Sequence, residues 1–319
     1  MSLIQRLMTP TSRRVALKGL IGASAMAHAV KMQLVSAQDD AEVKPATFRG
    51  PQTVIVGGLD SREKGQPENS DVLMLARIDL EAKTVRAISI PRDLYIEIPG
   101  FGADKITRAF DFGSKSQNGK FKAGAELLKA TIEQSFALEV DGVVMSTFHG
   151  FEDLVDALDG VEVDNPYDLT DNEYPTIDYG YTSIFYPAGV QTLDGKQALE
   201  FVRTRHQDGD PGRVMRQQLV LRALLEKAIA PEFADTLWEV VRENKKTVRT
   251  DLGPSKQLAY ALAAPDFTNE NVAFTTLQDY VFDDTTASGM WIYSGMWDQI
   301  PGFVQGFLDG TIEVEQATS

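Results

Sequence analysis

The sequence predicts an α/β protein built as one three-layer α/β/α sandwich around a mixed central sheet. Short apolar runs bounded by turn residues predict strands, and longer stretches with apolar residues at helical intervals predict helices. These helices and hairpins interleave without a strict strand–helix–strand rhythm, which favours a mixed sheet over a parallel one. With 43% hydrophobic residues in 319, the chain can bury a sizeable core.

The first half of the chain supplies most of the expected strands. "TVIVGGLD", from Thr53, predicts a buried strand that ends in a glycine turn, and "DVLMLARIDLEAKTVRAISI", from Asp71, predicts a hairpin with a polar turn. "AGAELLKATIEQSF" predicts a helix and "GVVMST" a short strand. "FEDLVDALDG" predicts an amphipathic helix that ends at Gly160.

The second half is expected to be more helical. Residues 165–188 are rich in aromatics and are expected to be irregular, whereas "LDGKQALEFV" predicts a helix. A further helix is expected from Pro211 to about Ala230, with Asp210 as its N-cap. After Pro231 the pattern favours more helical segments, with "NVAFTTL" and "GMWIY" as candidate strands. The aromatics of residues 289–308 are expected to pack in the core rather than face a membrane.

The N-terminus resembles a twin-arginine export signal. Arg13 and Arg14 precede an apolar run from Gly19 to Val30, which is shorter than the roughly 20 residues that span a bilayer. The small residues of "VSAQ" suit cleavage after Ala37; the alternative is an uncleaved anchor. Either alternative places the body of the protein outside the cytoplasmic membrane, in the cell envelope. We therefore interpret residues 1–37 as a signal or anchor segment and residues 38–50 as a polar linker.

The composition excludes several classes of function. A formal net charge of −15 argues against nucleic acid as a partner, because phosphate backbones favour basic surfaces. The absence of cysteine excludes disulfides, thiolate metal sites and a cysteine nucleophile. No Ser-His-Asp order or zinc-ligand spacing stands out. One histidine, His206, lies among arginines and is expected to face solvent rather than line a site.

Arginines are concentrated in one stretch of this acidic chain, "FVRTRHQDGDPGRVMRQQ". It holds Arg203, Arg205, Arg213 and Arg216. At 100° per residue, Arg213, Arg216 and Gln217 fall on one face of the predicted helix, and an apolar stripe runs beside them. Several guanidinium groups around one point suit a multiply charged phosphate group such as a pyrophosphate. The alternative is that these arginines pair with surface carboxylates.

Two shorter motifs carry further charged residues. In "SIPRD", Arg92 and Asp93 follow the end of a predicted strand, where functional side chains are often held. Asp60 and Asp71 flank a loop between two predicted strands, and two such carboxylates can bind Mg²⁺ together with substrate phosphates. The alternatives are a surface Arg–Asp pair and turn-forming aspartates.

Together these segments resemble the LytR-CpsA-Psr family over about residues 53–228. The resemblance is carried by "NSDVLMLARID", "SIPRD", "DKITRAFDFG", "FEDLVDALDGVEV" and "LDGKQALEFVRTRHQDGDPGRVMRQQ", in this order. It implies an α/β/α sandwich with a long apolar pocket for a polyprenyl chain. It also implies a phosphotransferase that moves a glycopolymer from a polyprenyl-pyrophosphate carrier to the cell wall, typically peptidoglycan, through a phosphodiester bond and with Mg²⁺.

The resemblance also implies roles for single residues. Asp60 and Asp71 would be the carboxylates on the metal side. Asp93 and Gln217 would orient arginines or the acceptor, and Lys105 would add positive charge near the phosphates. From the chemistry of the transfer step, Asp93 is also one candidate general base. Asp210 matches the family's aspartate before the "GR" pair. The pyrophosphate would be clamped by Arg62, Arg92, Arg203, Arg205, Arg213 and Arg216. Residues 51–230 would form the catalytic domain, and residues 231–319 would complete it.

The chain departs from the family in two places. Members are usually anchored by an N-terminal transmembrane helix, where this chain has its twin-arginine-like segment, so a membrane surface is a partner only by expectation. The family often has paired glycines where this chain has Asp159 and Gly160. Two other functions stay open: a non-catalytic extracytoplasmic module that binds a lipid or polyanion, and a phosphatase that acts on polyprenyl pyrophosphates.

Overall fold

The computed structural model describes residues 43–60, 68–176, 180–230 and 248–314. The predicted signal segment, Arg62 and the stretch after Pro231 to residue 247 lie outside these ranges. Residues Ala46–Ser319 form one compact unit. No helix within the described ranges combines the length and apolar character needed to cross a bilayer.

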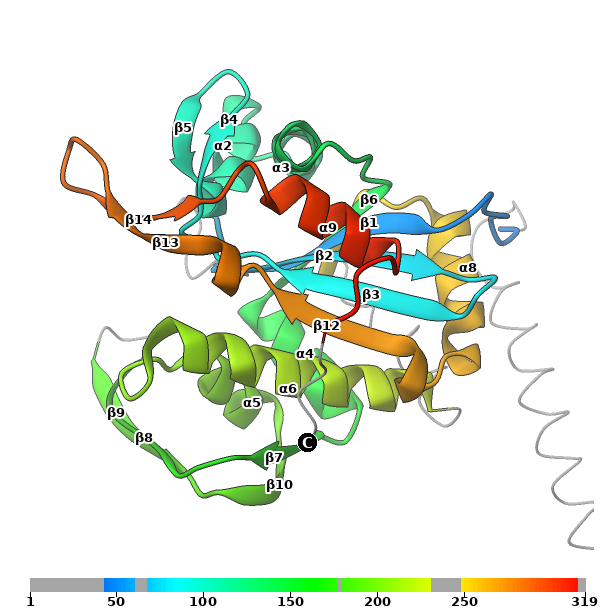
Figure 1. Cartoon of the computed structure of the whole chain (residues 1–319). Coiled ribbons are helices and arrows are strands. Elements are labelled where there is room, and N and C mark those ends of the chain that lie inside the picture. Colours follow the sequence, from blue (N-terminus) through cyan, green and yellow to red (C-terminus); the bar gives the residue numbers. More distant parts are fainter. Residues whose placement is uncertain (1–42, 61–67, 177–179, 231–247, 315–319) are drawn as a thin grey trace, which may run out of the picture. The chain divides into compact units, whose positions relative to one another are not determined.

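A six-stranded mixed sheet forms the centre of the molecule (Figure 1). Its order is β11-β6-β1-β2-β3-β12, and its strands span Gln52–Asp60 (β1), Asn69–Asp79 (β2), Thr84–Ser89 (β3), Gly142–Thr147 (β6), Val248–Thr250 (β11) and Val272–Thr276 (β12). The β1–β6 and β3–β12 pairs are parallel, and the other three are antiparallel. The predicted α/β fold with a mixed sheet, and the β2–β3 hairpin within it, are therefore confirmed.

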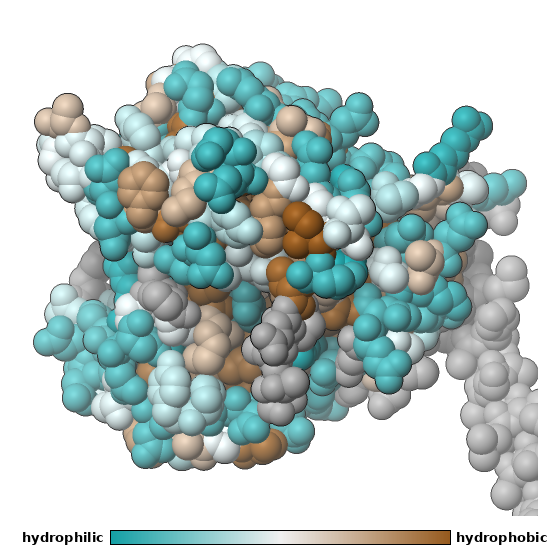
Figure 2. Space-filling view, viewed as in Figure 1, coloured by the Kyte–Doolittle hydropathy of each residue, from teal (hydrophilic) through white to brown (hydrophobic). Residues whose placement is uncertain are grey.

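One face of this sheet is covered by three helices. They are α2 (Ala109–Ser116), α3 (Phe121–Phe136) and α9 (Ile300–Leu308), and they lie together above the sheet in Figure 1. Ile55 and Leu59, on one side of β1, point into the core between the sheet and these helices. Phe303 and Phe307 of α9 lie in this core, as expected, whereas Trp291 stays 42% exposed. Figure 2 shows hydrophilic residues over most of the visible face, with hydrophobic ones gathered near its middle.

The opposite face of the sheet is covered by α4 (Phe148–Ala157), α5 (Gly195–Arg203) and α6 (Gly209–Ile229). Val220 and Leu224 of α6 pack into a second core, with β7 (Val161–Asn165) and β10 (Gly189–Leu193) on its far side. Leu221 and Leu225 pack toward the sheet instead. Helix α6 is therefore apolar on two sides, which fixes its orientation between the sheet and the second core.

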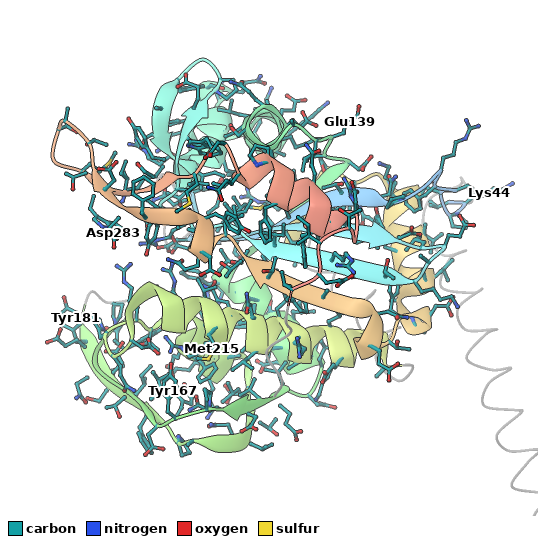
Figure 3. The ribbon with its side chains drawn as sticks, viewed as in Figure 1. Lys44, Glu139, Tyr167, Tyr181, Met215 and Asp283 are labelled. Carbon is teal, nitrogen blue, oxygen red and sulfur yellow. The ribbon has the colours of Figure 1, made fainter. Side chains whose placement is uncertain are left out.

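Residues 165–188 are not irregular as predicted, because they contain the paired strands β8 (Leu169–Pro175) and β9 (Tyr181–Tyr186). Ile184 and Tyr186 are buried, while Tyr181 and Phe185 are 73% and 60% exposed. Figure 3 shows Tyr181 at the outer edge of this layer. The aromatics occupy both faces of the ribbon, and this hid the two-residue alternation that marks a strand.

Helix α6 begins two residues earlier than predicted. It starts at Gly209, and its N-cap is Asp208 rather than Asp210. The side chain of Asp208 makes no capping hydrogen bond, and its carboxylate instead accepts hydrogen bonds from Arg216, about two turns further along the helix. Asp210 lies in the first turn of the helix. The predicted end near Ala230 agrees with the last helical residue, Ile229.

Helix α4 ends at Ala157, and two consecutive residues with left-handed backbone follow it. Asp159 has a φ of 55° and Gly160 a φ of 77°. Glycine adopts this conformation without strain, whereas an aspartate does so at a modest cost. The position at which the family often has paired glycines is thus one where the backbone conformation favours glycine.

The remaining elements pack around this frame. They include β4 (Tyr95–Ile98), β5 (Gly102–Lys105), α8 (Pro254–Ala263), β13 (Val281–Thr285) and β14 (Trp291–Gly295). Four short helices also belong to this group, η2 (Ile106–Arg108), η3 (Ala264–Asp266), η4 (Asn269–Asn271) and η5 (Gln278–Tyr280). The strand β12 comes from the C-terminal part of the chain and joins the edge of the main sheet beside β3. The two predicted C-terminal strands therefore exist as β12 and β14.

Candidate active site

A pocket of about 570 Å³ lies between the central sheet and helices α4, α5 and α6. Its inner wall is apolar and comes from both layers: Val56, Val72, Met74 and Val144 from the sheet, and Phe151, Leu154, Leu199, Val202, Val220, Leu221 and Leu224 from the helices. The period of a strand places Val56, Gly58 and Asp60 of β1 on this same side. The wall therefore changes from apolar to charged where β1 ends.

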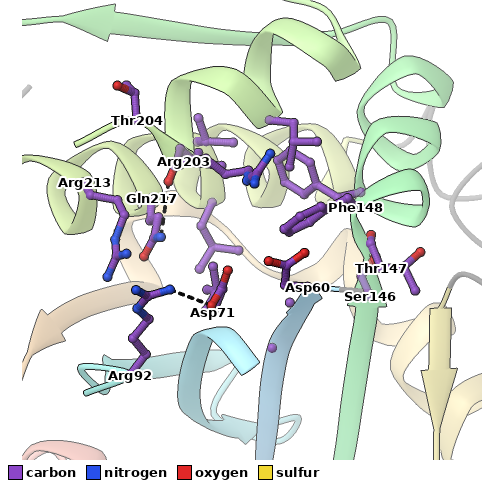
Figure 4. Close-up of a pocket in the computed structure, with 18 of the residues that line it drawn as sticks. Asp60, Asp71, Arg92, Ser146, Thr147, Phe148, Arg203, Thr204, Arg213 and Gln217 are labelled. Carbon is purple, nitrogen blue, oxygen red and sulfur yellow. Dashed lines mark hydrogen bonds and ion pairs between the residues drawn. The ribbon is translucent and has the colours of Figure 1, made fainter. Parts of the chain in front are cut away.

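The charged part of the wall, which we call the polar end, gathers residues that are far apart in the sequence (Figure 4). It comprises Asp60, Asp71, Arg92, Arg203, Arg205, Arg213 and Gln217. All seven belong to the predicted set of site residues. The structure thus brings together side chains from β1, β2, the segment after β3, α5 and its following loop, and α6.

Asp60 and Asp71 form the acidic side of the polar end. Asp60 is the last residue of β1, and Asp71 is the third residue of β2. The register of this pair shifts between Gly58, which faces Val72, and Leu59, which faces Ser70. Asp71 is the extra residue of this β-bulge, and bulges commonly redirect a side chain toward a functional site.

Arg92 lies between two carboxylates. Its Nη1 donates to Oδ1 of Asp71 at 2.7 Å, and its Nε donates to Oδ2 of Asp93 at 3.2 Å. Burial alone would lower the pKa of Arg92, but the charges of Asp71 and Asp93 outweigh burial and raise it. The guanidinium therefore stays charged and is held at the pocket wall by both aspartates.

Asp93 and Lys105 support Arg92 from behind the pocket. Lys105 Nζ donates to Oδ1 of Asp93 at 2.7 Å, and neither residue lines the pocket. Burial favours the neutral form of Asp93, but hydrogen bonds and charges from Lys105 and Arg92 outweigh it and hold its pKa below the usual range. A buried carboxylate held by two cations is a poor proton acceptor. Its position agrees with orienting an arginine rather than with a general base.

Arg203 is the last residue of α5 and is held by aromatic rings. Its Cζ lies 4.3 Å from the centre of the Phe148 ring, and its Nη1 donates to the hydroxyl of Tyr174 at 3.1 Å. Such cation–π contacts fix a guanidinium without neutralising its charge. Arg205 also lines the pocket but is exposed, so the two arginines border the polar end at different depths.

Arg213 and Gln217 lie four residues apart on α6 and line the pocket together. Arg213 is only 6% exposed, and Gln217 donates from Nε2 to the carbonyl of Val202 at 3.3 Å. Figure 4 shows the side chains of Arg213 and Arg92 pointing toward one another from opposite walls. Two cations that converge in this way favour an anion between them.

Arg216 does not lie at the polar end, in contrast to the prediction. It is fully buried and absent from the pocket wall. Its Nε donates to the carbonyl of Phe201 at 2.8 Å, its Nη2 to the carbonyl of Thr204, and its terminal nitrogens to the carboxylate of Asp208. This guanidinium joins the end of α5 to the start of α6 and makes four hydrogen bonds within the protein. Its role is therefore structural.

The sequence did not predict that Asp171, Thr204 and His206 would meet on the pocket wall. Asp171 of β8 accepts hydrogen bonds from the hydroxyl of Thr204 and from Nδ1 of His206. His206 lines the pocket, although its side chain is also 51% exposed, as expected for a residue facing solvent. The signal in the sequence was an aspartate at an inward position of β8, and the aromatics on both faces of the β8–β9 ribbon hid it.

The carboxylates of the polar end suit a Mg²⁺ ion that shares its ligands with a substrate better than an ion held by protein side chains alone. In the described part of the chain, no three His, Cys, Asp or Glu side chains gather to hold an ion by themselves. Mg²⁺ commonly uses one or two carboxylates and completes its shell with water and substrate phosphates. Asp60 and Asp71 provide hard oxygen atoms of this kind on one side of the arginines. Binding of Mg²⁺ remains a proposal.

Fold and site together define a protein suited to a ligand with an apolar chain and a multiply charged anionic head. The chain matches the LytR_cpsA_psr family over residues 19–302 and belongs to it. The resemblance expected from the sequence motifs is thereby confirmed.

Curated relatives carry a common description. The chain is 32% identical over 242 residues to the polyisoprenyl-teichoic acid–peptidoglycan teichoic acid transferase TagU of Oceanobacillus iheyensis, covering 75% of this chain and 70% of that protein. It is 37% identical over 180 residues to the corresponding TagT of Bacillus subtilis, covering 55% of this chain and 52% of that protein. The matched region thus spans 70% of one relative and 52% of the other.

Solved structures show the same fold. The structure of B. subtilis TagV superposes with a TM-score of 0.65 at 22% identity, covering 82% of this chain and 99% of that one. A structure of TagT bound to LI-WTA superposes with a TM-score of 0.61 at 27% identity, covering 83% of this chain and 94% of that one.

Proposed function

We propose that this protein is a phosphotransferase that moves a glycopolymer from a polyprenyl-pyrophosphate carrier to peptidoglycan through a phosphodiester bond. One observation carries the proposal: an apolar pocket opens directly onto a polar end where Arg92 and Arg213 converge from opposite walls. The names of the relatives, which describe transfer from a polyisoprenyl carrier to peptidoglycan, support this assignment.

The proposed donor has two chemically different parts, and the pocket matches each of them. The polyprenyl chain would lie against the apolar wall, where each buried methylene contributes about 0.8 kcal/mol. The pyrophosphate would lie at the polar end, against Arg92, Arg203 and Arg213. Each guanidinium group can donate two hydrogen bonds to phosphate oxygens. Three such groups would therefore hold the pyrophosphate in position and offset its negative charge.

Asp60 and Asp71 would hold a Mg²⁺ ion beside the pyrophosphate. When bound, the ion would offset negative charge on the phosphate oxygens. Asp71 would then serve two partners, since it already accepts a hydrogen bond from Arg92. Lys105 and Asp93 would keep Arg92 in place from outside the pocket.

The reaction needs positioning and charge neutralisation more than covalent chemistry by the protein. A sugar hydroxyl of the acceptor would attack the phosphorus that carries the glycan. The bond to the bridging oxygen would break, and polyprenyl phosphate would leave with the electron pair. Arg92, Arg203 and Arg213 would stabilise the charge that develops on that bridging oxygen.

The proposed donor also implies where the protein works. A polyprenyl carrier resides in a membrane, and its glycan is used in the wall, so the protein would act at the outer surface of the cytoplasmic membrane. Export by the twin-arginine-like segment would bring it there. This segment lies outside the described residues, so the proposed location rests on the sequence and on the proposed donor.

The experiment is a transfer assay with full-length protein, lipid-linked glycopolymer, peptidoglycan oligomers and Mg²⁺. Mass spectrometry should find the glycan joined to the oligomer through a phosphodiester, together with released polyprenyl phosphate. Hydrolysis of the donor to free glycan phosphate, with no glycan joined to the peptidoglycan that is present, would indicate a phosphatase. Binding of the donor with no turnover, with or without Mg²⁺, would indicate a non-catalytic binding module.

A further inference from the structure

We infer that His206, held by Asp171, is the general base that removes the proton from the attacking hydroxyl group. The inference rests on the proposed transfer reaction and adds a residue to it. The site as described so far binds the donor and stabilises charge, but none of its arginines accepts a proton. Asp93 is excluded by its burial and by its bonds to Lys105 and Arg92.

The first observation is the geometry of the His206–Asp171 pair. Nδ1 of His206 lies 2.8 Å from Oδ1 and 2.9 Å from Oδ2 of Asp171, which is 1% exposed. The same carboxylate accepts hydrogen bonds from the hydroxyl of Thr204 and, at 2.9 Å, from the backbone N–H of Glu173. Four donor contacts on one buried carboxylate fix its position, and through it the position of the imidazole.

The second observation concerns which ring nitrogen is available. Burial raises the pKa of Asp171, but its hydrogen bonds from Thr204, His206 and Glu173 outweigh burial and lower it. The ionised carboxylate only accepts, so Nδ1 of His206 must carry the hydrogen. In the neutral ring the acceptor lone pair is then on Nε2. Among the described residues, none forms a hydrogen bond with Nε2.

The third observation is the place of His206 on the wall. It lines the pocket one residue beyond Arg205 and three beyond Arg203, and its side chain is half exposed. The apolar wall is taken by the lipid in the proposed complex, so the acceptor must approach from solvent. A half-exposed imidazole beside the arginines lies on that side. The exposed carboxylate described on this wall belongs to Glu173, which is the rival base tested below.

The proposed step balances without a further reactant. The acceptor oxygen forms its bond to phosphorus while the bond from phosphorus to the bridging oxygen breaks, and polyprenyl phosphate takes that electron pair. The hydroxyl proton passes to Nε2 of His206. The resulting imidazolium, which is stabilised by Asp171, returns the proton to water through its exposed side.

The test compares His206→Ala with His149→Gln, a change at an exposed histidine of α4 outside the pocket wall. Removal of a general base should lower kcat by about 100-fold or more. Binding of the lipid-linked donor, measured by co-purification and mass spectrometry, should not change. Added imidazole should restore turnover of His206→Ala in proportion to its concentration, because it replaces the missing base. His149→Gln should behave as wild type.

Asp171 acts here as a positioning residue, and a double variant tests that role. Asp171→Asn should lower kcat in the wild-type background but have little further effect in His206→Ala, because its partner is already gone. A purely structural loss would persist in both backgrounds.

The outcomes separate the general base from the proposed function. If wild type transfers glycan and His206→Ala keeps kcat within about 3-fold, a range too small for a general base, the inference is wrong and the transferase stands. The inference is also wrong if Glu173→Gln loses activity and added imidazole fails to restore turnover in His206→Ala. Glu173 would then be the general base. If wild type itself transfers nothing, the proposed function fails, and the role of His206 falls with it.

Discussion

Arg92 donates a hydrogen bond of 2.7 Å to Asp71 and so links the basic and acidic sides of the polar end. Both side chains are 22% exposed, and the two residues come from different segments of the chain. This contact means that a metal bound by Asp71 and a phosphate bound by Arg92 would be adjacent. The pair therefore couples the two parts of the proposed pyrophosphate site.

Asp71→Asn should raise the Mg²⁺ concentration needed for half-maximal transfer by about tenfold or more, as expected for loss of one of two carboxylate ligands. The side chain keeps its size, and its amide oxygen can still accept from Arg92. A titration of initial rate against Mg²⁺ measures the change. Asp153→Asn, an exposed residue of α4, is the matched control. An unchanged Mg²⁺ requirement in Asp71→Asn would contradict the proposed metal site.

Arg213→Ala should lower transfer by about 100-fold or more, because it removes a charged donor from one wall of the polar end. Arg222→Ala on the same helix is the control, since Arg222 lies near Phe274 and away from the pocket wall. Steady-state rates with lipid-linked donor, together with circular dichroism of both variants, make the comparison. Equal activity of the two variants would remove Arg213 from the site. Arg203→Ala is expected to behave as Arg213→Ala does.

Arg216→Met should act on stability. Arg216 is fully buried, and its removal takes a donor from the carbonyls of Phe201 and Thr204. It also leaves the carboxylate of Asp208 without its ion-pair partner and with the hydroxyl of Tyr167 as its remaining side-chain donor. Breaking such a buried pair costs about 3–5 kcal/mol of unfolding free energy. Denaturant unfolding, with Arg222→Met as control, measures it. A variant as stable as wild type but inactive would instead support the earlier expectation that Arg216 binds the ligand.

Asp93→Asn should change how stability depends on pH. The pKa of Asp93 is lower in the folded protein than in an unfolded chain, so its contribution is present at neutral pH. That contribution is lost as the pH falls from the pKa of an aspartate in an unfolded chain, about 4, through the lower pKa of Asp93 in the folded protein. Asp93→Asn should therefore unfold more easily at pH 7, by about 1–3 kcal/mol, with a smaller difference at acid pH. Unfolding curves across pH, with Asp164→Asn on the exposed side of β7 as control, decide it.

Leu221→Trp should block the apolar part of the pocket. Leu221 lies on its wall, and an indole would occupy space that the proposed lipid chain needs. We expect less polyprenyl lipid to co-purify and a higher KM for the donor. Leu262→Trp, at a leucine that is 43% exposed on α8, controls for the added ring. Normal lipid content in Leu221→Trp would place the lipid elsewhere.

Local patterns were enough for most of the fold. The apolar runs of β1, β2 and β3 and the helical patterns of α3, α5 and α6 depend on neighbours in the sequence, so they could be predicted. The β8–β9 ribbon was missed because Tyr181 and Phe185 put aromatics on its exposed face. An apolar residue at an outward position removes the contrast on which the prediction of a strand depends.

The candidate site was predicted in its residue types but not in its arrangement. Helical spacing correctly placed Arg213 beside Gln217, yet it also placed Arg216 with them. Arg216 is turned by only 60° from Arg213, so periodicity alone does not decide between the pocket and the α5–α6 junction. The acceptors that hold it, on Phe201, Thr204 and Asp208, are supplied by the packing of two helices.

By itself, the sequence determined the α/β frame, the arginines and carboxylates of the polar end, and membership of the family, because each of these rests on residue type and short-range spacing. The folded chain decided which of those charges meet. Asp171 holds His206 across 35 residues, and Arg92 bonds Asp71 across 21. Such contacts depend on the strand bulge and on the strand register, neither of which is a local property of the chain.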